Sequence, residues 1–394
     1  MSWTAAEWGN RGGQLLDADP RLGQRLIAKA LCLEPGAAIL LFNLGIALHQ
    51  QRNIAAAIRA YALALQQPKP PHKPIINNLA QDLLLHGQLR QGWAYYENRF
   101  KPGQHDYFKQ LLGEPWTGHD PARPAHLVLV AEQGLGDTLQ FCRYALALQN
   151  SGIRITLFCQ PALVAYLSRH SELRDVTRCV EADQLEPGSR WCPLMSLPHR
   201  LGTERDSIPA GTPYLGSDPA LSAAWNKRLQ RRAGHRLIGL HWQGNPGHEH
   251  SLYSRGRSMR FEDWRVLRPP AGVEFVSLQK GHGQEQWRND AGLPFVAGQQ
   301  AFNASLDFDD TAAVLRNCDL VISADSGIVH LAGAMGIPTW VALRWVPEWR
   351  WLLEGCGSPW YPSLRLFRQP RDGAWPEVVQ AMAQALQQWT RDRQ

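Results

Sequence analysis

The hydrophobic positions of the chain follow two different periods, which divide it into two parts. In roughly the first 110 residues, apolar and small residues recur three or four positions apart, as on one face of a helix; Leu44, Gly45 and Leu48 are an example. From His126 onward, short apolar runs alternate with helical stretches, which is typical of parallel sheets covered by helices. The pattern therefore predicts an α/β protein with an N-terminal all-α extension.

The helical part contains an internal repeat. Ala64 follows Ala30 by 34 positions, and Pro68 follows Pro35 at one position less than that offset. A further copy starts near Lys73, and a degenerate copy is expected before residue 35. A period of this length is typical of stacked helical hairpins and resembles the tetratricopeptide repeat. An unrelated helical bundle is the alternative interpretation.

Eight candidate strands follow the repeats. They are His126–Val130, Arg154–Cys159, Val176–Val180, Trp191–Met195, Arg236–Trp242, Glu274–Leu278, Leu320–Ser323 and Thr339–Leu343. A Gly- and Pro-rich connection over 101–124 precedes them, and a stretch over 209–234 separates the first four from the last four. Two doubly wound, Rossmann-like domains with a ligand cleft between their strand ends are expected. The predicted parts are helical repeats over 1–110, a linker over 111–125, a first domain over 126–215 and a second over 235–394.

Composition and charge exclude several classes of protein. No apolar run approaches the roughly 20 residues of a membrane helix, and the N-terminus lacks a secretion signal, so we expect a cytoplasmic protein without a transmembrane segment. The first 110 residues hold 12 basic and 7 acidic side chains, a net +5 of the total +6, but without the clusters typical of nucleic-acid binding. The seven cysteines contain no Cys-x-x-Cys pair, so most are expected to be reduced thiols, and no metal is expected.

The most informative segment is the apolar run Leu320–Ile322, which ends in polar and small residues before a helix expected near His330. The polar block reads Ser323, Ala324, Asp325, Ser326, Gly327. Ligands of α/β proteins bind at the carboxyl ends of such strands, and the first N–H groups of the following helix favour a phosphate. The segment therefore predicts an anion-binding loop.

A second loop with chemical potential follows the first predicted strand. It contains Gly134, Leu135, Gly136 and Asp137 before a helix expected near Leu139. Two glycines permit a tight turn and a close backbone approach. Asp137 then either caps the helix or acts in catalysis, and the spacing leaves both open. The full dinucleotide fingerprint is absent, which argues against a nicotinamide-dependent oxidoreductase.

Two further strand ends of the second domain carry polar residues. Gly244 and Asn245 follow the strand that ends at Trp242, and Gln279 and Lys280 follow the strand that ends at Leu278. Lys280 is a candidate for neutralising a diphosphate, with simple exposure to solvent as the alternative. The helix after Asp309, Asp310 and Thr311 begins with a residue suited to capping.

The segment 344–361 is rich in aromatic rings beside charged residues. It includes Trp349 and Arg350 together with Trp345, Trp351, Trp360 and Tyr361. Rings in a loop after a strand either stack on a base or sugar or fill a junction between domains. Both interpretations remain open.

Taken together, the Gly134–Asp137 and Asp325–Ala332 blocks resemble bacterial heptosyltransferase-type glycosyltransferases, and with the repeats they resemble the variant fused to tetratricopeptide repeats. Further matching segments are His241–Pro246, Ser277–Gly281, Asp307–Thr311, Pro347–Leu353 and Ser358–Gln369. The resemblance implies a GT-B fold, in which the second domain binds a nucleotide sugar and the first receives the acceptor. It also implies an inverting, metal-independent transfer without a cofactor.

The resemblance also implies roles for particular residues. Asp137 corresponds to the general base, and the donor is held by Asp325, Ser326, Gly327 and His330. A carboxylate suits removal of the acceptor proton, and a helix start suits the leaving diphosphate. Because Asp325 would repel a phosphate, we expect it to bind a hydroxyl or fix its loop. The other expected donor contacts are Gly244, Asn245, Gln279 and Lys280, and the expected acceptor-side residues are Gly134, Leu135, Gly136, Trp349 and Arg350.

Two departures from the family pattern affect the predicted function. The basic residue that heptosyltransferases carry after the first donor-domain strand is replaced by His241, Trp242 and Gln243. The first domain is also short, so the repeats are expected to supply part of the acceptor surface. The predicted function is transfer of a sugar from a nucleotide donor to a hydroxyl of a glycan or protein. The alternative is an inactive tetratricopeptide scaffold with a degenerate glycosyltransferase domain.

Overall fold

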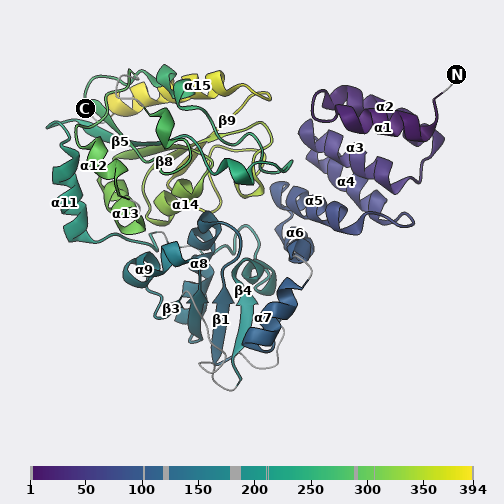
Figure 1. The fold of residues 1–394 in the computed structure, drawn as a ribbon, viewed down its shortest axis with the longest axis horizontal. Coiled ribbons are helices and arrows are strands. Elements are labelled where there is room, and N and C mark those ends of the chain that lie inside the picture. Colours follow the sequence, from purple (N-terminus) through teal and green to yellow (C-terminus); the bar gives the residue numbers. More distant parts are fainter. Residues whose placement is uncertain are drawn as a thin grey trace. The chain divides into compact units, whose positions relative to one another are not determined.

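The computed structural model describes residues 3–100, 103–118, 124–177, 188–209, 211, 213–287, 292–305 and 307–392. They form two compact units (Figure 1). The repeat unit comprises Met1–Pro102, Gly202–Asp206 and Val346–Glu354; the sheet unit comprises Gly103–Leu201, Ser207–Trp345 and Gly355–Gln394. Two short segments from later in the chain thus belong with the N-terminal helices.

The repeat unit is built from consecutive helical hairpins, drawn in purple and blue in Figure 1. They are α1 (Ala5–Leu15) with α2 (Pro20–Leu33), α3 (Ala38–Gln50) with α4 (Ile54–Leu65), and α5 (His72–Leu85) with α6 (Leu89–Tyr96), followed by the short 3-10 helix η1 (Glu97–Arg99). This arrangement confirms the predicted helical N-terminal part.

A glycine and a tyrosine explain how the second hairpin packs. A Cβ atom on Gly45 in α3 would lie 2.3 Å from the ring of Tyr61 in α4, so only glycine leaves room for that ring. Tyr61 is fully buried, and its hydroxyl accepts a 3.3 Å hydrogen bond from Asn78 in the next hairpin. The Tyr61 side chain therefore links neighbouring hairpins.

Residues 346–354 pack within the repeat unit through aromatic and charged contacts. The ring of Trp349 meets that of Trp93 edge-on, with 5.1 Å between the ring centres. Arg52 donates to the carbonyl of Leu353 at 2.5 Å and to the carboxylate of Glu354 at 3.0 Å. The 3-10 helix η7 (Trp349–Trp351) thus packs on α5 and α6, and Arg52, in the turn after α3, holds the residues that follow η7.

The first sheet of the sheet unit is parallel, with strand order β3-β2-β1-β4. Its strands are β1 (His126–Val130), β2 (Arg154–Phe158), β3 (Val176–Thr177) and β4 (Arg190–Pro193), and its helices are α7 (Gln104–Leu112), α8 (Leu135–Asn150), α9 (Pro161–His170), η3 (Leu194–Ser196) and α10 (Leu197–Arg200). Residues 178–180, the rest of the third predicted strand, lie outside the described residues, as does Cys179.

The second sheet is also parallel, with strand order β6-β5-β7-β8-β9. Its strands are β5 (Arg236–His241), β6 (Val273–Ser277), β7 (Leu320–Ala324), β8 (Thr339–Leu343) and β9 (Leu364–Arg368). Its helices are α11 (Pro219–Leu229), η4 (Pro246–His248), η5 (Phe261–Leu267), η6 (Gln284–Gln286), α12 (Gln299–Asn303), α13 (Phe308–Asn317), α14 (Gly327–Ala334) and α15 (Trp375–Arg391). Apolar residues of α15, such as Val379 and Met382, belong to the hydrophobic core of this domain. The two doubly wound sheets confirm the predicted fold class.

The structure contains three elements that the sequence analysis did not predict. The connection over 101–124 contains α7, whose Phe108 and Leu112 pack on Val128 and Trp191 of the first sheet. The stretch 209–234 contains α11, which packs on α13. Strand β9 was not predicted because Arg365 and Arg368 interrupt its apolar run, although its other residues are largely buried.

Among the residues that the structure describes, no helix is long and apolar enough to cross a membrane. The described cysteines are all free thiols: Cys142, Cys159, Cys192 and Cys318 are buried, whereas Cys32 and Cys356 are exposed.

Candidate active site

The candidate site lies where the second sheet reverses its strand order. Strands β5 and β7 are neighbours, with His241 beside Ser323, and the chain leaves β5 towards β6 on one side and β7 towards β8 on the other. Such a reversal leaves a crevice at the carboxyl ends of the strands, where ligands of α/β proteins bind. The hydroxyl of Ser326 lies 3.1 Å from Nδ1 of His241 at this point. Burial lowers the pKa of His241 to about 3, so its imidazole is neutral at ordinary pH.

The helix after β7 begins without a side-chain cap. Helix α14 starts at Gly327 rather than near His330, and Ser326 precedes it in an extended conformation. Because the Ser326 hydroxyl turns to His241, it does not bond the first N–H groups of the helix. Unbonded N–H groups at a helix start, together with the helix dipole, favour an anion.

Asp325 is buried beside this helix start. Its exposed fraction is 8%, and its carboxylate forms no hydrogen bond or ion pair with any other residue that the structure describes. Among the described residues, no contact thus supports a role of Asp325 in fixing its loop, which was one of the two roles expected for it. Binding a hydroxyl remains as its expected role.

The loop after β1 places a carboxylate at another helix start. Helix α8 begins at Leu135, four residues before the expected position, so Asp137 lies in its first turn. Its Oδ2 atom accepts a hydrogen bond of 2.8 Å from the N–H of Gly134. Asp137 thus stabilises the helix start, and it remains partly exposed, as a residue that meets a substrate must be.

The two helix starts meet at a pair of glycines. A Cβ atom on Gly136 would lie 3.2 Å from the Cα atom of Gly327 and 2.9 Å from Cδ2 of His330. A larger residue than glycine at position 136 would therefore push α8 and α14 apart. The structure thus brings together the Gly134–Asp137 and Ser326–His330 loops, which the sequence predicted on opposite sides of one cleft.

A buried arginine supports this junction from the same helix as Asp137. Arg143 donates to the carbonyl of Trp360 at 2.8 Å and to the hydroxyl of Tyr214 at 3.1 Å, and its guanidinium lies 4.7 Å from the ring centre of Tyr361. The Tyr361 hydroxyl in turn lies 3.0 Å from Nδ1 of His330. Sequence reasoning missed Arg143 and Tyr214; the one available signal was a charged residue among the apolar residues of the helix.

A second contact joins the two domains of the sheet unit. Asp309 in α13 accepts from Nε2 of His170 at 2.7 Å and from Arg169 at 2.6 Å, both at the end of α9. The expected capping role belongs instead to Asp307, whose carboxylate accepts from the N–H of Asp310 at 2.8 Å. Asp309 is thus a domain contact.

Gln279 and Lys280, which were expected to bind the donor, are engaged within the protein. The Gln279 amide accepts from the N–H groups of Trp242 and Gln243 at 3.1 and 3.0 Å and donates to two carbonyls. The Lys280 ammonium lies 3.6 Å from the ring centre of Phe302 and donates to the carbonyl of that residue. Burial lowers the pKa of Lys280 to about 8.

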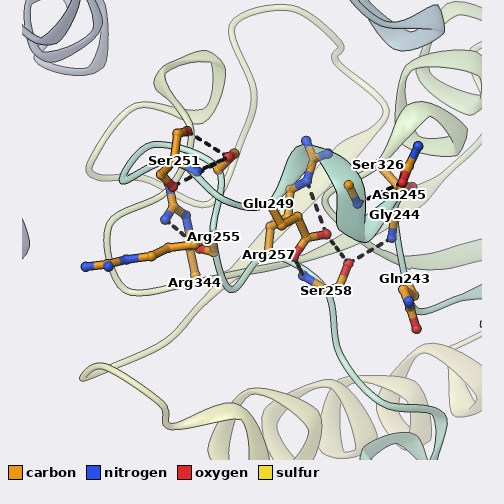
Figure 2. Close-up of polar contacts among 12 residues, drawn as sticks. Gln243, Gly244, Asn245, Glu249, Ser251, Arg255, Arg257, Ser258, Ser326 and Arg344 are labelled. Atoms are coloured by element: carbon orange, nitrogen blue, oxygen red, sulfur yellow. Dashed lines mark hydrogen bonds and ion pairs between the residues drawn. The ribbon is translucent and has the colours of Figure 1, made fainter. Parts of the chain in front are cut away.

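Gly244 and Asn245 begin a polar loop after β5, shown in Figure 2. The N–H of Gly244 donates to the Ser258 hydroxyl at 2.9 Å, and the Asn245 side chain accepts from Gly247 at 2.9 Å. Ser258 donates to Glu249, which also lies 3.5 Å from Nε of Arg257. Sequence reasoning missed these last three residues because no motif marks them in the loop after β5.

Trp349 and Arg350 were expected on the acceptor side, but they belong to the repeat unit. Trp349 is buried, and the guanidinium of Arg350 pairs with Glu348 and lies 4.0 Å from the Trp349 ring centre. Their association with the other candidates stays a prediction. Trp351, Trp360 and Tyr361 are also buried, which favours the packing interpretation of these rings over stacking on a ligand.

In the described parts of the chain, no three His, Cys, Asp or Glu side chains come together as a metal-binding group.

Comparison with known families gives the class of the second domain. The model of Glycosyltransferase family 9 (heptosyltransferase) matches residues 290–343, a stretch that contains α13, β7, α14 and the Asp325–His330 block. This segment of the chain matches glycosyltransferase family 9. This confirms the resemblance predicted from the sequence, and with it the expected enzyme class.

A curated relative covers more of the chain than the family 9 match does. Protein FlbA of Caulobacter vibrioides is 28% identical over 363 residues, which cover 84% of this chain and 58% of FlbA. The chain therefore spans little more than half the length of that relative.

The solved structures that the comparison found include glycosyltransferases, each with a TM-score below 0.5. The ADP-heptose LPS heptosyltransferase II of E. coli has a TM-score of 0.41 at 11% identity, covering 68% of this chain and 99% of its own. A family 9 glycosyltransferase of Veillonella parvula has a TM-score of 0.49 at 11% identity, with 66% and 96% covered. An O-GlcNAc transferase variant of Thermobaculum terrenum covers 100% of this chain and 94% of its own, with a TM-score of 0.27 at 13% identity.

Proposed function

We propose that the chain transfers a sugar from a nucleoside-diphosphate sugar to a hydroxyl group, with inversion at the sugar carbon and without a metal ion. The observation that carries the proposal is the meeting of two helix starts at Gly136 and Gly327. One of them holds the carboxylate of Asp137, and the other has no side-chain cap. These two features at one junction support a base on the α8 side and an anion site on the α14 side.

The acceptor reacts on the Asp137 side. Its hydroxyl oxygen bonds to the sugar carbon while the carbon–oxygen bond to the diphosphate breaks on the opposite face, which inverts the configuration. The proton of that hydroxyl passes to the Asp137 carboxylate, and the electron pair of the broken bond leaves with the diphosphate. The hydrogen bond from Gly134 at 2.8 Å holds the carboxylate in place for this step.

The leaving diphosphate is stabilised on the α14 side. The N–H groups at Gly327 and the following residue, together with the helix dipole, oppose the negative charge that accumulates on the phosphate oxygen. Such fixed dipoles need no reorganisation during the reaction and make a metal ion unnecessary for this purpose.

Asp325 binds a hydroxyl of the donor sugar or its ribose. Its carboxylate is buried, with an exposed fraction of 8% for the residue and no partner among the described residues, so a neutral donor group is the chemical match for it. A phosphate would be repelled.

The acceptor is a glycan or a protein held in part by the helical repeats. This part of the proposal rests on the short first domain, whose sheet has strand order β3-β2-β1-β4, and on the stacked hairpins of the repeat unit. Repeat arrays of this kind commonly offer extended binding surfaces.

The decisive experiment combines binding and turnover. Thermal shifts with a panel of nucleoside diphosphates and their sugars identify the donor class, since a ligand of the folded state raises the melting temperature with concentration. Asp137→Asn is then expected to lower transfer, or slow hydrolysis of the nucleotide sugar, by roughly 100- to 10,000-fold, with nucleotide affinity nearly unchanged. Asp106→Asn, in the first turn of α7, is the control for an equal change of charge.

Turnover by Asp137→Asn at the rate of the native chain would remove the proposed base. A native chain that binds the nucleotide but neither transfers nor hydrolyses its sugar would support the inactive scaffold instead.

A further inference from the structure

The chain after β5 forms a closed loop over residues 243–258. The N–H of Met259 donates to the carbonyl of Trp242 at 2.9 Å, and the N–H of Gly244 donates to the Ser258 hydroxyl at 2.9 Å. The two ends of the loop therefore lie together at the carboxyl end of β5. Compact loops with adjacent ends, such as this one, are often functional. We call residues 243–258 the β5 loop.

The far part of the β5 loop is fixed to a different strand. Arg344 follows β8 directly and donates to the carbonyls of Leu252, Tyr253 and Arg255 at 3.2, 2.7 and 2.7 Å. Because β7 lies between β5 and β8, the loop runs past the carboxyl end of β7, where Ser326 precedes α14. Figure 2 shows the loop residues with Arg344 and Ser326 in one view.

Arg344, Lys280 and Arg257 are three cationic side chains near the carboxyl ends of these strands, and they differ in the hydrogen bonds that they form within the protein. The guanidinium of Arg344 bonds three carbonyls, and the ammonium of Lys280 bonds one carbonyl and lies over the Phe302 ring. Arg257 forms no hydrogen bond to any residue that the structure describes. Of these three side chains, Arg257 alone keeps its donors for a ligand.

Glu249 orients Arg257 without occupying its outer nitrogens. The ion pair joins Oε1 of Glu249 to Nε of Arg257 at 3.5 Å, and Glu249 is itself held by the N–H and hydroxyl of Ser258. The outer nitrogen Nη2 lies 3.6 Å from where a Cβ on Gly244 would be, so a glycine there leaves the approach to the guanidinium open. The side chain is one quarter exposed.

We infer that Arg257 binds the diphosphate of the donor, replacing the basic residue that the sequence lacks after β5, and that Glu249 is its positioning residue. The inference rests on the proposed function. An arginine fork matches two phosphate oxygens at once, and such charged hydrogen bonds are stronger than neutral ones. The cation reaches the site from the closing end of the β5 loop, while α14 provides backbone N–H groups from the other side.

The test compares nucleoside diphosphates with nucleosides. The affinities of ADP, GDP, UDP and dTDP, and of the nucleoside of whichever base binds, are measured by calorimetry for the full chain. Arg257→Gln is expected to weaken diphosphate binding roughly 10- to 100-fold, as loss of charged hydrogen bonds does, and to leave nucleoside binding unchanged. Arg257→Lys keeps the charge but not the fork, so its affinity is expected between the two.

Arg260→Gln is the matched control, because Arg260 is largely exposed and pairs only with nearby Glu262 and Asp263 among the described residues. It removes the same charge three positions away and is expected to bind like the native chain. Glu249→Gln is expected to weaken diphosphate binding less than Arg257→Gln does.

Native affinity for the diphosphate in Arg257→Gln would overturn the inference, as would an equal loss of nucleoside and diphosphate binding. Should Arg257→Gln fail to fold, Arg257→Lys decides: unchanged diphosphate affinity overturns the inference, and a selective loss supports it. A native chain that binds none of the diphosphates would remove the proposed function itself, which is a distinguishable result.

Discussion

The starts of α8 and α14 meet at two glycines, but only the start of α8 carries a negatively charged side chain. In α8, the first turn carries Asp137, whose carboxylate bonds back to Gly134. In α14, the one hydroxyl at the cap position turns away to His241, and no side chain caps the helix. One helix dipole is thus already offset by a negative charge, whereas the other is left for a charge from outside the chain. In the proposed function, this difference separates the base from the site of the diphosphate.

The largest effect is expected from a substitution that gives the start of α14 a negative charge of its own, as the start of α8 has. Gly327→Asp places a carboxylate at the first helical position, where a Cβ atom would lie 3.8 Å from its nearest neighbour, the backbone nitrogen of Gly136, and so fits without strain. Repulsion at close range in a partly shielded site is worth several kcal/mol, so the affinity for a nucleoside diphosphate should fall on the order of 100-fold or more. Calorimetric titration measures the loss.

Although Gly327→Asp should weaken diphosphate binding, it should not lower the stability of the fold. An acid at a helix start and the loss of a helical glycine both favour the folded state, so the melting temperature should hold or rise. Gly327→Asn has nearly the same size without the charge and should bind the diphosphate far better. An equal loss of diphosphate affinity in Gly327→Asp and Gly327→Asn would mean that the size of the side chain matters rather than its charge. The proposed difference in charge between the two helix starts would then not explain binding.

Sequence reasoning located both loops, because each requires a particular order of residue types. A glycine pair before Asp137 and a Ser-Gly step after a buried strand are visible in a single chain. It missed residues that meet only through the fold. Arg143 reaches Tyr361 across more than 200 positions, and Arg257 returns to Gly244 at the end of a loop whose length carries no signal. Lys280 was a reasonable candidate that the fold directs to Phe302 instead.

The neutral imidazole of His241 explains why the Ser326 hydroxyl is unavailable to α14, and pH tests it. In the unfolded chain a histidine takes up its proton near pH 6.5, whereas His241 in the fold has its pKa lowered to about 3. Between those values the unfolded state binds more protons, so the free energy of unfolding falls as the pH falls. The slope attributable to this group is roughly 1.4 kcal/mol per pH unit.

Denaturant unfolding at several pH values between about 7.5 and 4.5 measures that slope across the range in which the unfolded histidine titrates. In His241→Gln the decline should be shallower by about one proton, even if the variant is less stable at neutral pH. His248→Gln, at an exposed position, should keep the native slope. An unchanged slope in His241→Gln would mean that His241 is protonated in the fold and that Ser326 faces a charge.

The smallest effect is expected from loss of the hydrogen bond between Tyr361 and His330 of α14. Tyr361→Phe removes only the hydroxyl that lies 3.0 Å from Nδ1 of His330, and the ring still packs against Gly333 and Arg143. The lost hydrogen bond should lower the free energy of unfolding by about 1 kcal/mol and weaken diphosphate binding a few-fold, because the ring of His330 is no longer fixed beside Gly136.

Tyr166→Phe is the matched control, since that buried tyrosine donates to the carbonyl of Gly216 at 2.9 Å. This variant should lose similar stability with no change in diphosphate binding. If both variants bind the diphosphate like the native chain, His330 holds the two helix starts together without orienting the donor, and the anion site depends on the α14 backbone rather than on this side chain.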